Sequence, residues 1–308
     1  MGKTGQPPWA KRILKLLEQA KAKDPDFERF GAYSHQYRLA APASEEQIMK
    51  FEEQQGIRLP EEYRDFLLHV GNGGAGPYYG LYGIRDLGDG LHDSHGARIY
   101  RVQEEPVIYP KMSDEEWNRM TAPESRQGDS MGKGGEVHPY VGVLPIGSQG
   151  CTLMTGLMLA GPYRGQVVYY DEDYCGPPFF VREKGFLSWY ERWLREVIAG
   201  YSDGETGFGM NIDGNPTQLM ELYEQAQDPE DKMEIMIDHV VLCRYCAEIL
   251  SDKRFPDNPV RRRCDRKVAA GGKPGGLVVR EALQDFPAVT ADIVDYAIVD
   301  GLFAGREY

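Results

Sequence analysis

The chain has 308 residues, of which 41% are hydrophobic, and this is enough apolar material for one large domain or two ordinary ones. Its net charge of −13 argues against nonspecific nucleic-acid binding. No run of about 18 apolar residues predicts a membrane helix, no signal peptide is evident, and five irregularly spaced cysteines make no disulfide framework. We therefore expect a cytoplasmic protein without a membrane segment.

The charge is unevenly spread along the chain. Residues 1–30 carry a net +3 and residues 251–280 a net +6, which leaves −22 on the remaining residues. An acidic body of this kind favours a basic partner, although solubility alone accounts for the acidity of many cytosolic proteins. The basic run at 261–267 is able to bind an acidic partner. Its role is left open.

A basic amphipathic helix is predicted at about residues 8–23, and we assign residues 1–34 to this N-terminal region. Docking of its apolar face on the rest of the chain is favoured over binding to a membrane surface. A connector over 31–42 follows, from which Tyr37 and Leu39 can enter a sheet. The apolar face of the helix carries Trp9, Ile13, Leu16, Leu17 and Ala20.

Two short helices and a glycine-rich loop come next. Ser44 and Gln47 form a capping box at the start of the first helix, and Gly56 ends it. Pro60 suits the start of the second helix. The run Asn72-Gly73-Gly74-Ala75-Gly76-Pro77 is a loop because neither helices nor strands tolerate that composition. The second helix carries one apolar stripe, formed by Tyr63, Phe66, Leu67 and Val70.

The next segments alternate between turns and short elements. Residues 78–87 read as a strand or an edge segment. Ser113 and Glu116 form a second capping box, which opens a short helix with Trp117. Antiparallel strands are then predicted, followed by an aromatic helix over about 186–198. The predicted strands cover about 140–144, 151–160, 165–170 and 177–181.

A glycine- and aspartate-rich stretch from residue 202 predicts a domain boundary. We therefore assign residues 35–201 to a central domain and 202–308 to a helical C-terminal extension. Its helices are expected at about 216–227, 229–251, 280–286 and 291–303.

The central domain resembles the SMI1/KNR4, or SUKH, family over roughly residues 35–200. The resemblance implies an α+β fold with a curved, mostly antiparallel or mixed sheet and helices packed on one side, to which this chain adds the helical C-terminal extension. Beside the loop Asn72-Gly73-Gly74 and the aromatic helix, the matching residues are Gly56, Leu59, Pro60, Tyr63, Phe66, Leu67, Leu144, Pro145 and Gly147.

The resemblance also implies a non-catalytic protein-binding module that needs no cofactor. Many bacterial members are similar to immunity proteins, so we expect neutralisation of a basic toxin domain, such as a nuclease, by an occluding acidic surface. A regulatory interaction protein without a toxin is the alternative. If the family's binding cleft carries over, Pro60, Tyr63 and Phe66 support it from beneath. Its rim is then formed by Asn72, Gly73, Gly74, Tyr78 and Tyr79.

Two groups of possible metal ligands receive less weight. A metal-dependent hydrolase would use His92, Asp93, His95 and His138, but a polar loop is the simpler reading because no regular helix surrounds them. A zinc site would use His239, Cys243 and Cys246, but no second ligand pair is evident, so structural cysteines are favoured.

Overall fold

The computed structural model describes residues 6–89, 105–122, 138–200, 207–212, 216–227 and 235. The chain divides into two compact units, Met1–Asn211 and Ile212–Tyr308. In the second unit the described helix is α8 (Pro216–Gln225), close to the first helix predicted there. The other helices predicted for the C-terminal extension, the basic run at 261–267 and the group His239, Cys243 and Cys246 lie outside the described residues.

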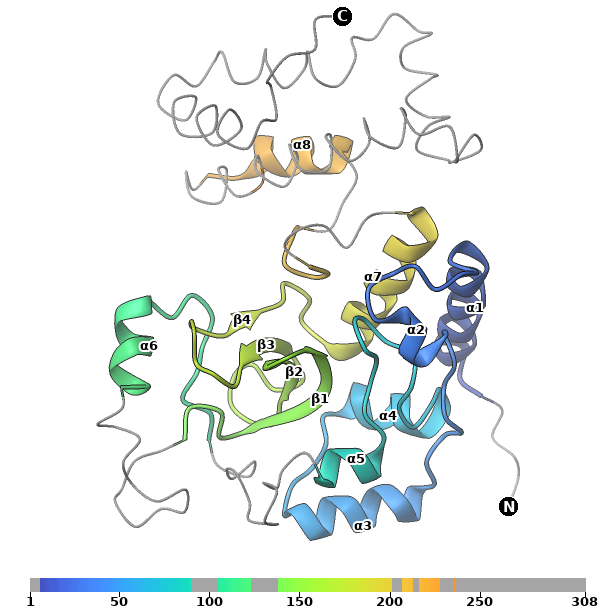
Figure 1. The fold of residues 1–308 in the computed structure, drawn as a ribbon, viewed down its shortest axis with the longest axis horizontal. Helices are drawn as coiled ribbons and strands as arrows, with labels where there is room; N and C mark the ends of the chain where they lie inside the picture. Colours follow the sequence, from blue (N-terminus) through green and yellow to red (C-terminus); the bar gives the residue numbers. More distant parts are fainter. Residues whose placement is uncertain are drawn as a thin grey trace, which may run out of the picture. The chain divides into compact units, whose positions relative to one another are not determined.

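The described part of the first unit contains one antiparallel sheet of four strands in the order β1-β2-β3-β4 (Figure 1). β1 contains two irregularities in register, between Pro145 and Gly147 and between Ser148 and Gly150. Such bulges bend a strand. The predicted α+β fold is confirmed by this sheet and its helices. The strands are β1 (Val143–Gly150), β2 (Leu153–Met158), β3 (Val167–Asp171) and β4 (Phe179–Phe180).

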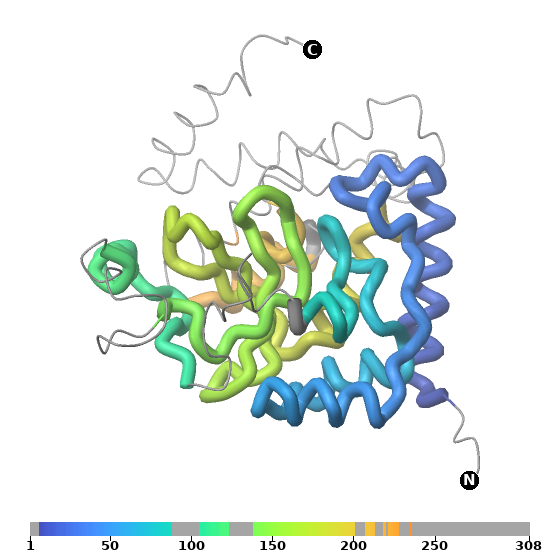
Figure 2. The backbone as a smooth tube through the Cα atoms, turned by 60° about the horizontal axis from the view of Figure 1, so that its bottom comes forward, coloured from blue at the N-terminus to red at the C-terminus, as the bar shows by residue number. Residues whose placement is uncertain are grey.

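Most of the described helices of this unit lie to one side of the sheet, and α6 lies across the sheet from them (Figures 1 and 2). Both α1 and α4 pack against α7. The apolar face of α1 is buried, as docking on the rest of the chain requires. The helices are α1 (Pro8–Lys23), α2 (Ala32–His35), α3 (Glu45–Gln55), α4 (Glu61–His69), α5 (Ile84–Asp89), α6 (Asp114–Met120) and α7 (Phe186–Ala199).

Both predicted capping boxes are present. At α3, the Gln47 backbone N–H donates to Ser44 Oγ at 3.2 Å, and the Ser44 N–H donates to Gln47 Oε1 at 2.8 Å. At α6, the same exchange joins Ser113 and Glu116. Gly56 ends α3 with φ of 67°, in the left-handed region that favours glycine.

The strand predicted over 78–87 is wrong for its second half, where the chain forms α5. The Ile84 N–H donates to Asn72 Oδ1 at 2.9 Å, and the Gly83 N–H donates to Asp86 Oδ2 at 3.3 Å. These two side chains satisfy backbone donors at the start of the helix. Only Leu81, in the first half, pairs as a strand residue would.

Single bridges continue the sheet beyond β1. Gly147 of β1 pairs with Leu81, Leu81 with Gly74, and Gly74 with Leu39, all antiparallel. Leu39, which was predicted to enter the sheet, therefore joins it through a single β-bridge to Gly74. This row brings the connector, the glycine-rich loop and β1 side by side.

Candidate interaction surface

Beneath the glycine-rich loop lies a buried aromatic cluster formed by Tyr63 and Phe66 of α4 with Phe186 and Tyr190 of α7. Phe66 lies edge-on to Phe186 and to Tyr190, with ring centroids 5.1 and 4.8 Å apart. All four side chains are inaccessible to solvent. The Tyr190 hydroxyl donates to the Ala75 carbonyl at 2.9 Å. The cluster thus holds the loop in place from below.

Within the loop, the three predicted rim residues Asn72, Gly73 and Gly74 make contacts that shape the backbone. Asn72 caps α5, as described above. Gly73 is buried, and Gly74 is half-buried in the row of bridges. Gly74 has φ of 102°, and a Cβ at this position would lie 2.4 Å from the Arg38 carbonyl oxygen. Glycine therefore allows the connector and the loop to touch.

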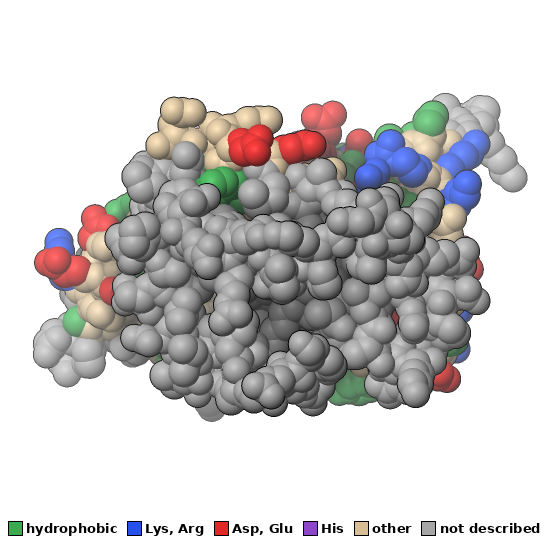
Figure 3. All heavy atoms as spheres, turned by 90° about the horizontal axis from the view of Figure 1, so that it is seen from above, with side chains coloured by type: hydrophobic (Ala, Val, Ile, Leu, Met, Phe, Trp, Pro, Cys, Tyr) green, Lys and Arg blue, Asp and Glu red, His purple; other side chains and the backbone are tan. Residues whose placement is uncertain are grey.

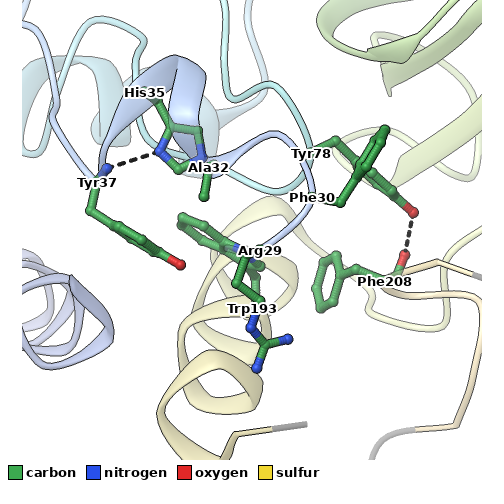
Figure 4. A pocket seen from close by; sticks show the side chains of 9 residues that line it. Arg29, Phe30, Ala32, His35, Tyr37, Tyr78, Trp193 and Phe208 are labelled. Carbon is green, nitrogen blue, oxygen red and sulfur yellow. Dashed lines mark hydrogen bonds between the residues drawn. The ribbon is translucent and has the colours of Figure 1, made fainter. Parts of the chain in front are cut away.

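The two predicted rim tyrosines differ in their surroundings. Tyr78 is half-buried, and its hydroxyl donates to the Phe208 carbonyl at 3.0 Å (Figure 4). Tyr79 packs against two aromatic rings that follow α1 in the chain, with centroids 5.4 Å from Phe30 and 6.0 Å from Tyr33. Tyr79 therefore belongs to the surface, whereas Tyr78 ties the loop to residues 207–211.

Phe30, Tyr33 and Tyr79 form what we call the exposed aromatic cluster. Phe30 is 54% exposed and Tyr33 is 62% exposed. Gly31, with φ of 78°, makes the approach possible, because a Cβ there would lie 2.2 Å from the Tyr78 carbonyl oxygen. Sequence reasoning missed Phe30 and Tyr33. The available signal was two aromatic residues, three positions apart, in a polar segment that shows no helical or strand period.

An open groove of about 420 Å³ borders the exposed aromatic cluster. This volume falls within the range of about 300–1,000 Å³ that is usual for binding sites. A second pocket, between α2, α7 and Phe208, has room for only about 10 Å³ (Figure 4), which is about the space of one water molecule. The groove is lined by Ser34, His35, Gln36, Arg38, Gly74, Tyr79 and Leu81.

His35 at the base of the groove is a neutral structural residue. Burial lowers its pKa to about 4. The Tyr37 N–H donates to His35 Nδ1 at 3.0 Å (Figure 4), and the imidazole lies edge-on to Trp193. The guanidinium of Arg38 is exposed and makes no ion pair with any described residue. Arg38 therefore carries the positive charge of the groove lining.

Exposed charged side chains of both signs occur on the described surface, some of them in ion pairs such as Arg119 with Glu115. Exposed basic residues follow α1, and Figure 3 shows a group of Lys and Arg side chains at one end of the face it presents. Exposed carboxylates occur in the first turns of α3, α4 and α6. Exposed carboxylates are thus spread over the starts of several helices.

The hydrolase hypothesis depends largely on residues outside the described part of the chain, since His92, Asp93 and His95 are not described. Burial lowers the pKa of His138 to about 4, and its ring nitrogens contact the Tyr174 hydroxyl at 3.0 Å and the Tyr140 N–H at 3.2 Å. Within the described ranges, no group of three or more His, Cys, Asp or Glu is able to hold a metal ion.

Taken together, helices that precede an antiparallel sheet and a closing aromatic helix define an α+β domain, which carries an exposed aromatic cluster. Residues 42–192 match the SMI1 / KNR4 family (SUKH-1). This match covers just under half of the chain and confirms the resemblance over the central domain. A comparison with curated proteins finds no significant match. None of the described helices is both long and apolar enough to cross a membrane.

Proposed function

We propose that this chain is an immunity protein, which binds a cognate toxin domain and neutralises it without catalysing a reaction. The observation that carries the proposal is the exposed aromatic cluster on a domain of a family known for immunity proteins. Large aromatic side chains and arginine are enriched at the centre of protein interfaces. Phe30, Tyr33 and Tyr79, with Arg38 nearby, have this composition.

Charge and aromatic contact have separate roles in the proposed mechanism. The net charge of −13 attracts a basic toxin domain, such as a nuclease, and raises the rate of encounter. The exposed aromatic cluster then loses its contact with water and slows dissociation. Bound in this way, the protein occludes the active site of the toxin. This function requires no cofactor and places the protein in the cytoplasm with its partner.

The proposal is tested by calorimetric titration of the full chain with the toxin-like C-terminal domain encoded by the adjacent upstream gene. We expect one-to-one binding with a nanomolar Kd and loss of that domain's activity in the same mixture. Binding should weaken in a variant that carries Phe30→Ala and Tyr33→Ala. Absence of binding to a partner domain shown to be folded would overturn the proposal.

A regulatory interaction protein is the second candidate, because residues 212–308 form a further unit outside the family match. A bound partner that keeps its own activity would favour this candidate over an immunity protein. The metal-dependent hydrolase alternative is tested separately, by the metal content of the purified full chain and the effect of His138→Gln on any hydrolytic activity.

A further inference from the structure

We infer that the groove beside Tyr79 is a subsite for a carboxylate on an extended segment of a protein partner, with Arg38 as its anchor. The described lining of the groove carries one cation and no anion, on a protein whose net charge is negative. The chain has 48 Asp and Glu residues against 35 Lys and Arg, yet no described Asp or Glu lines the groove. Its other lining side chains include the hydrogen-bond donors of Ser34 and Gln36.

The charges around the groove support this assignment. His35 is neutral, as its lowered pKa of about 4 shows, and adds no positive charge. Asp24, a carboxylate that acts on His35, is buried and already accepts from the Tyr37 hydroxyl at 2.7 Å and from the Glu28 N–H at 2.8 Å. No described residue therefore neutralises Arg38. An exposed guanidinium that makes no ion pair with a described residue is able to bind a carboxylate through two parallel hydrogen bonds.

The neighbouring aromatic rings indicate a protein segment as the source of this carboxylate. Tyr79 belongs both to the groove and to the exposed aromatic cluster. An extended segment with a carboxylate side chain in the groove places its next residues over Phe30 and Tyr33, where apolar side chains lose contact with water. A nucleic acid requires several phosphate-neutralising cations, whereas Arg38 is the one cationic side chain in the described lining.

Two capped peptides test this inference on the full ¹⁵N-labelled chain. The probe is Ac-Gly-Leu-Glu-Leu-Gly-NH2, and its neutral match is Ac-Gly-Leu-Gln-Leu-Gly-NH2. We expect the Glu peptide to shift the amide resonances of Ser34, Arg38 and Tyr79, and to bind about fivefold more tightly than the Gln peptide. Arg38→Gln should abolish this difference. Lys50→Gln, which removes an exposed charge on α3, should preserve it.

Equal binding of the two peptides, an unchanged preference in Arg38→Gln, or no shift of these amides at millimolar peptide would overturn the inference. It rests on the proposal that this face binds a protein, but the peptide assay needs no toxin. If the toxin domain fails to bind while the peptide response is present, the immunity function alone is overturned. If the toxin domain binds the chain and Arg38→Gln equally, the groove assignment alone is overturned.

Discussion

The molecule contains two aromatic clusters of similar geometry and opposite burial. In the buried cluster, the Tyr63 and Phe66 rings of α4 lie edge-on to Phe186 at 4.8 and 5.1 Å. In the exposed aromatic cluster, Tyr79 lies edge-on to Phe30 at 5.4 Å and to Tyr33 at 6.0 Å. The first cluster has no solvent contact, whereas Phe30 and Tyr33 keep more than half of their surface in water.

This difference in burial assigns the two clusters separate roles: the buried cluster stabilises the fold, and the exposed aromatic cluster is available to a partner. Burying an aromatic side chain on folding stabilises the domain by roughly 2–3 kcal/mol, so the α4–α7 cluster has already released that free energy. The exposed rings remain in contact with water, so most of this free energy is released only when a partner covers them. The predictions below test this separation, from the largest expected effect on the free energy of unfolding to the smallest.

Phe66→Ala should cause the largest loss. The side chain is fully buried and packs on both Phe186 and Tyr190. We expect the free energy of unfolding to fall by about 3–5 kcal/mol, because the substitution leaves a cavity between α4 and α7. Urea denaturation followed by tryptophan fluorescence measures the change. A loss below about 1 kcal/mol would show that this cluster does not hold the domain together.

Buried and exposed arginines extend the comparison to charge. Arg192 of α7 is 4% exposed and contacts Glu183 at 2.8 Å and Glu196 at 2.7 Å. We expect Arg192→Met to reduce the free energy of unfolding by about 3 kcal/mol at pH 7, because two shielded carboxylates lose their counter-charge.

The matched control for this variant is Arg195→Met on the same helix. Arg195 is exposed and pairs with Glu191, so we expect a loss of less than about 1 kcal/mol. Thermal and urea denaturation of both variants at pH 7 provide the comparison. Equal losses in the two variants would contradict the assigned role of Arg192.

Protonation of His35 should make stability depend on pH. Its pKa in the folded chain is lowered from 6.5 to about 4 by burial, so the unfolded chain binds the proton more tightly. Stability is therefore lost as the pH falls from about 6.5 towards 4. At pH 5, His35 alone should remove about 2 kcal/mol relative to the plateau above its unfolded pKa.

We expect the decrease in unfolding free energy between pH 7.5 and pH 5 to be smaller by about this amount in His35→Gln. His138, whose pKa is also lowered to about 4, continues to contribute in that variant. An NMR titration of the imidazole of His35 gives an independent reading. A midpoint near 6.5 would exclude the buried neutral state.

Tyr63 offers a change that leaves the buried cluster packed. Its hydroxyl is buried and has no hydrogen-bond partner among the described residues. Because an unsatisfied buried hydroxyl is unfavourable, we expect Tyr63→Phe to raise the free energy of unfolding by up to about 1 kcal/mol. Phe66→Tyr, which adds a hydroxyl to the same cluster, is the control and should destabilise. Destabilisation by Tyr63→Phe would reveal a partner for the hydroxyl.

The sequence predicts those features that depend on neighbouring residues. The capping boxes at Ser44 and Ser113 and the apolar stripe of α4 follow from local spacing, and all are present. α5 was missed because its first N–H is capped by Asn72, twelve residues earlier in the chain. The exposed aromatic cluster was missed in part because it depends on the close approach of Gly31 to Tyr78, a contact between distant segments.

The smallest effect on stability, and the clearest test of the separation, is expected for Tyr33→Ala. Tyr33 is 62% exposed, so its removal should change the free energy of unfolding by less than about 0.5 kcal/mol. The same change should weaken partner binding about tenfold or more. Met49→Ala is the matched control, since Met49 is 53% exposed on α3 and lies outside the cluster. Because both variants delete an exposed hydrophobic side chain, weaker binding in Tyr33→Ala alone assigns the contact to the exposed aromatic cluster, and equal binding by the two variants removes Tyr33 from it.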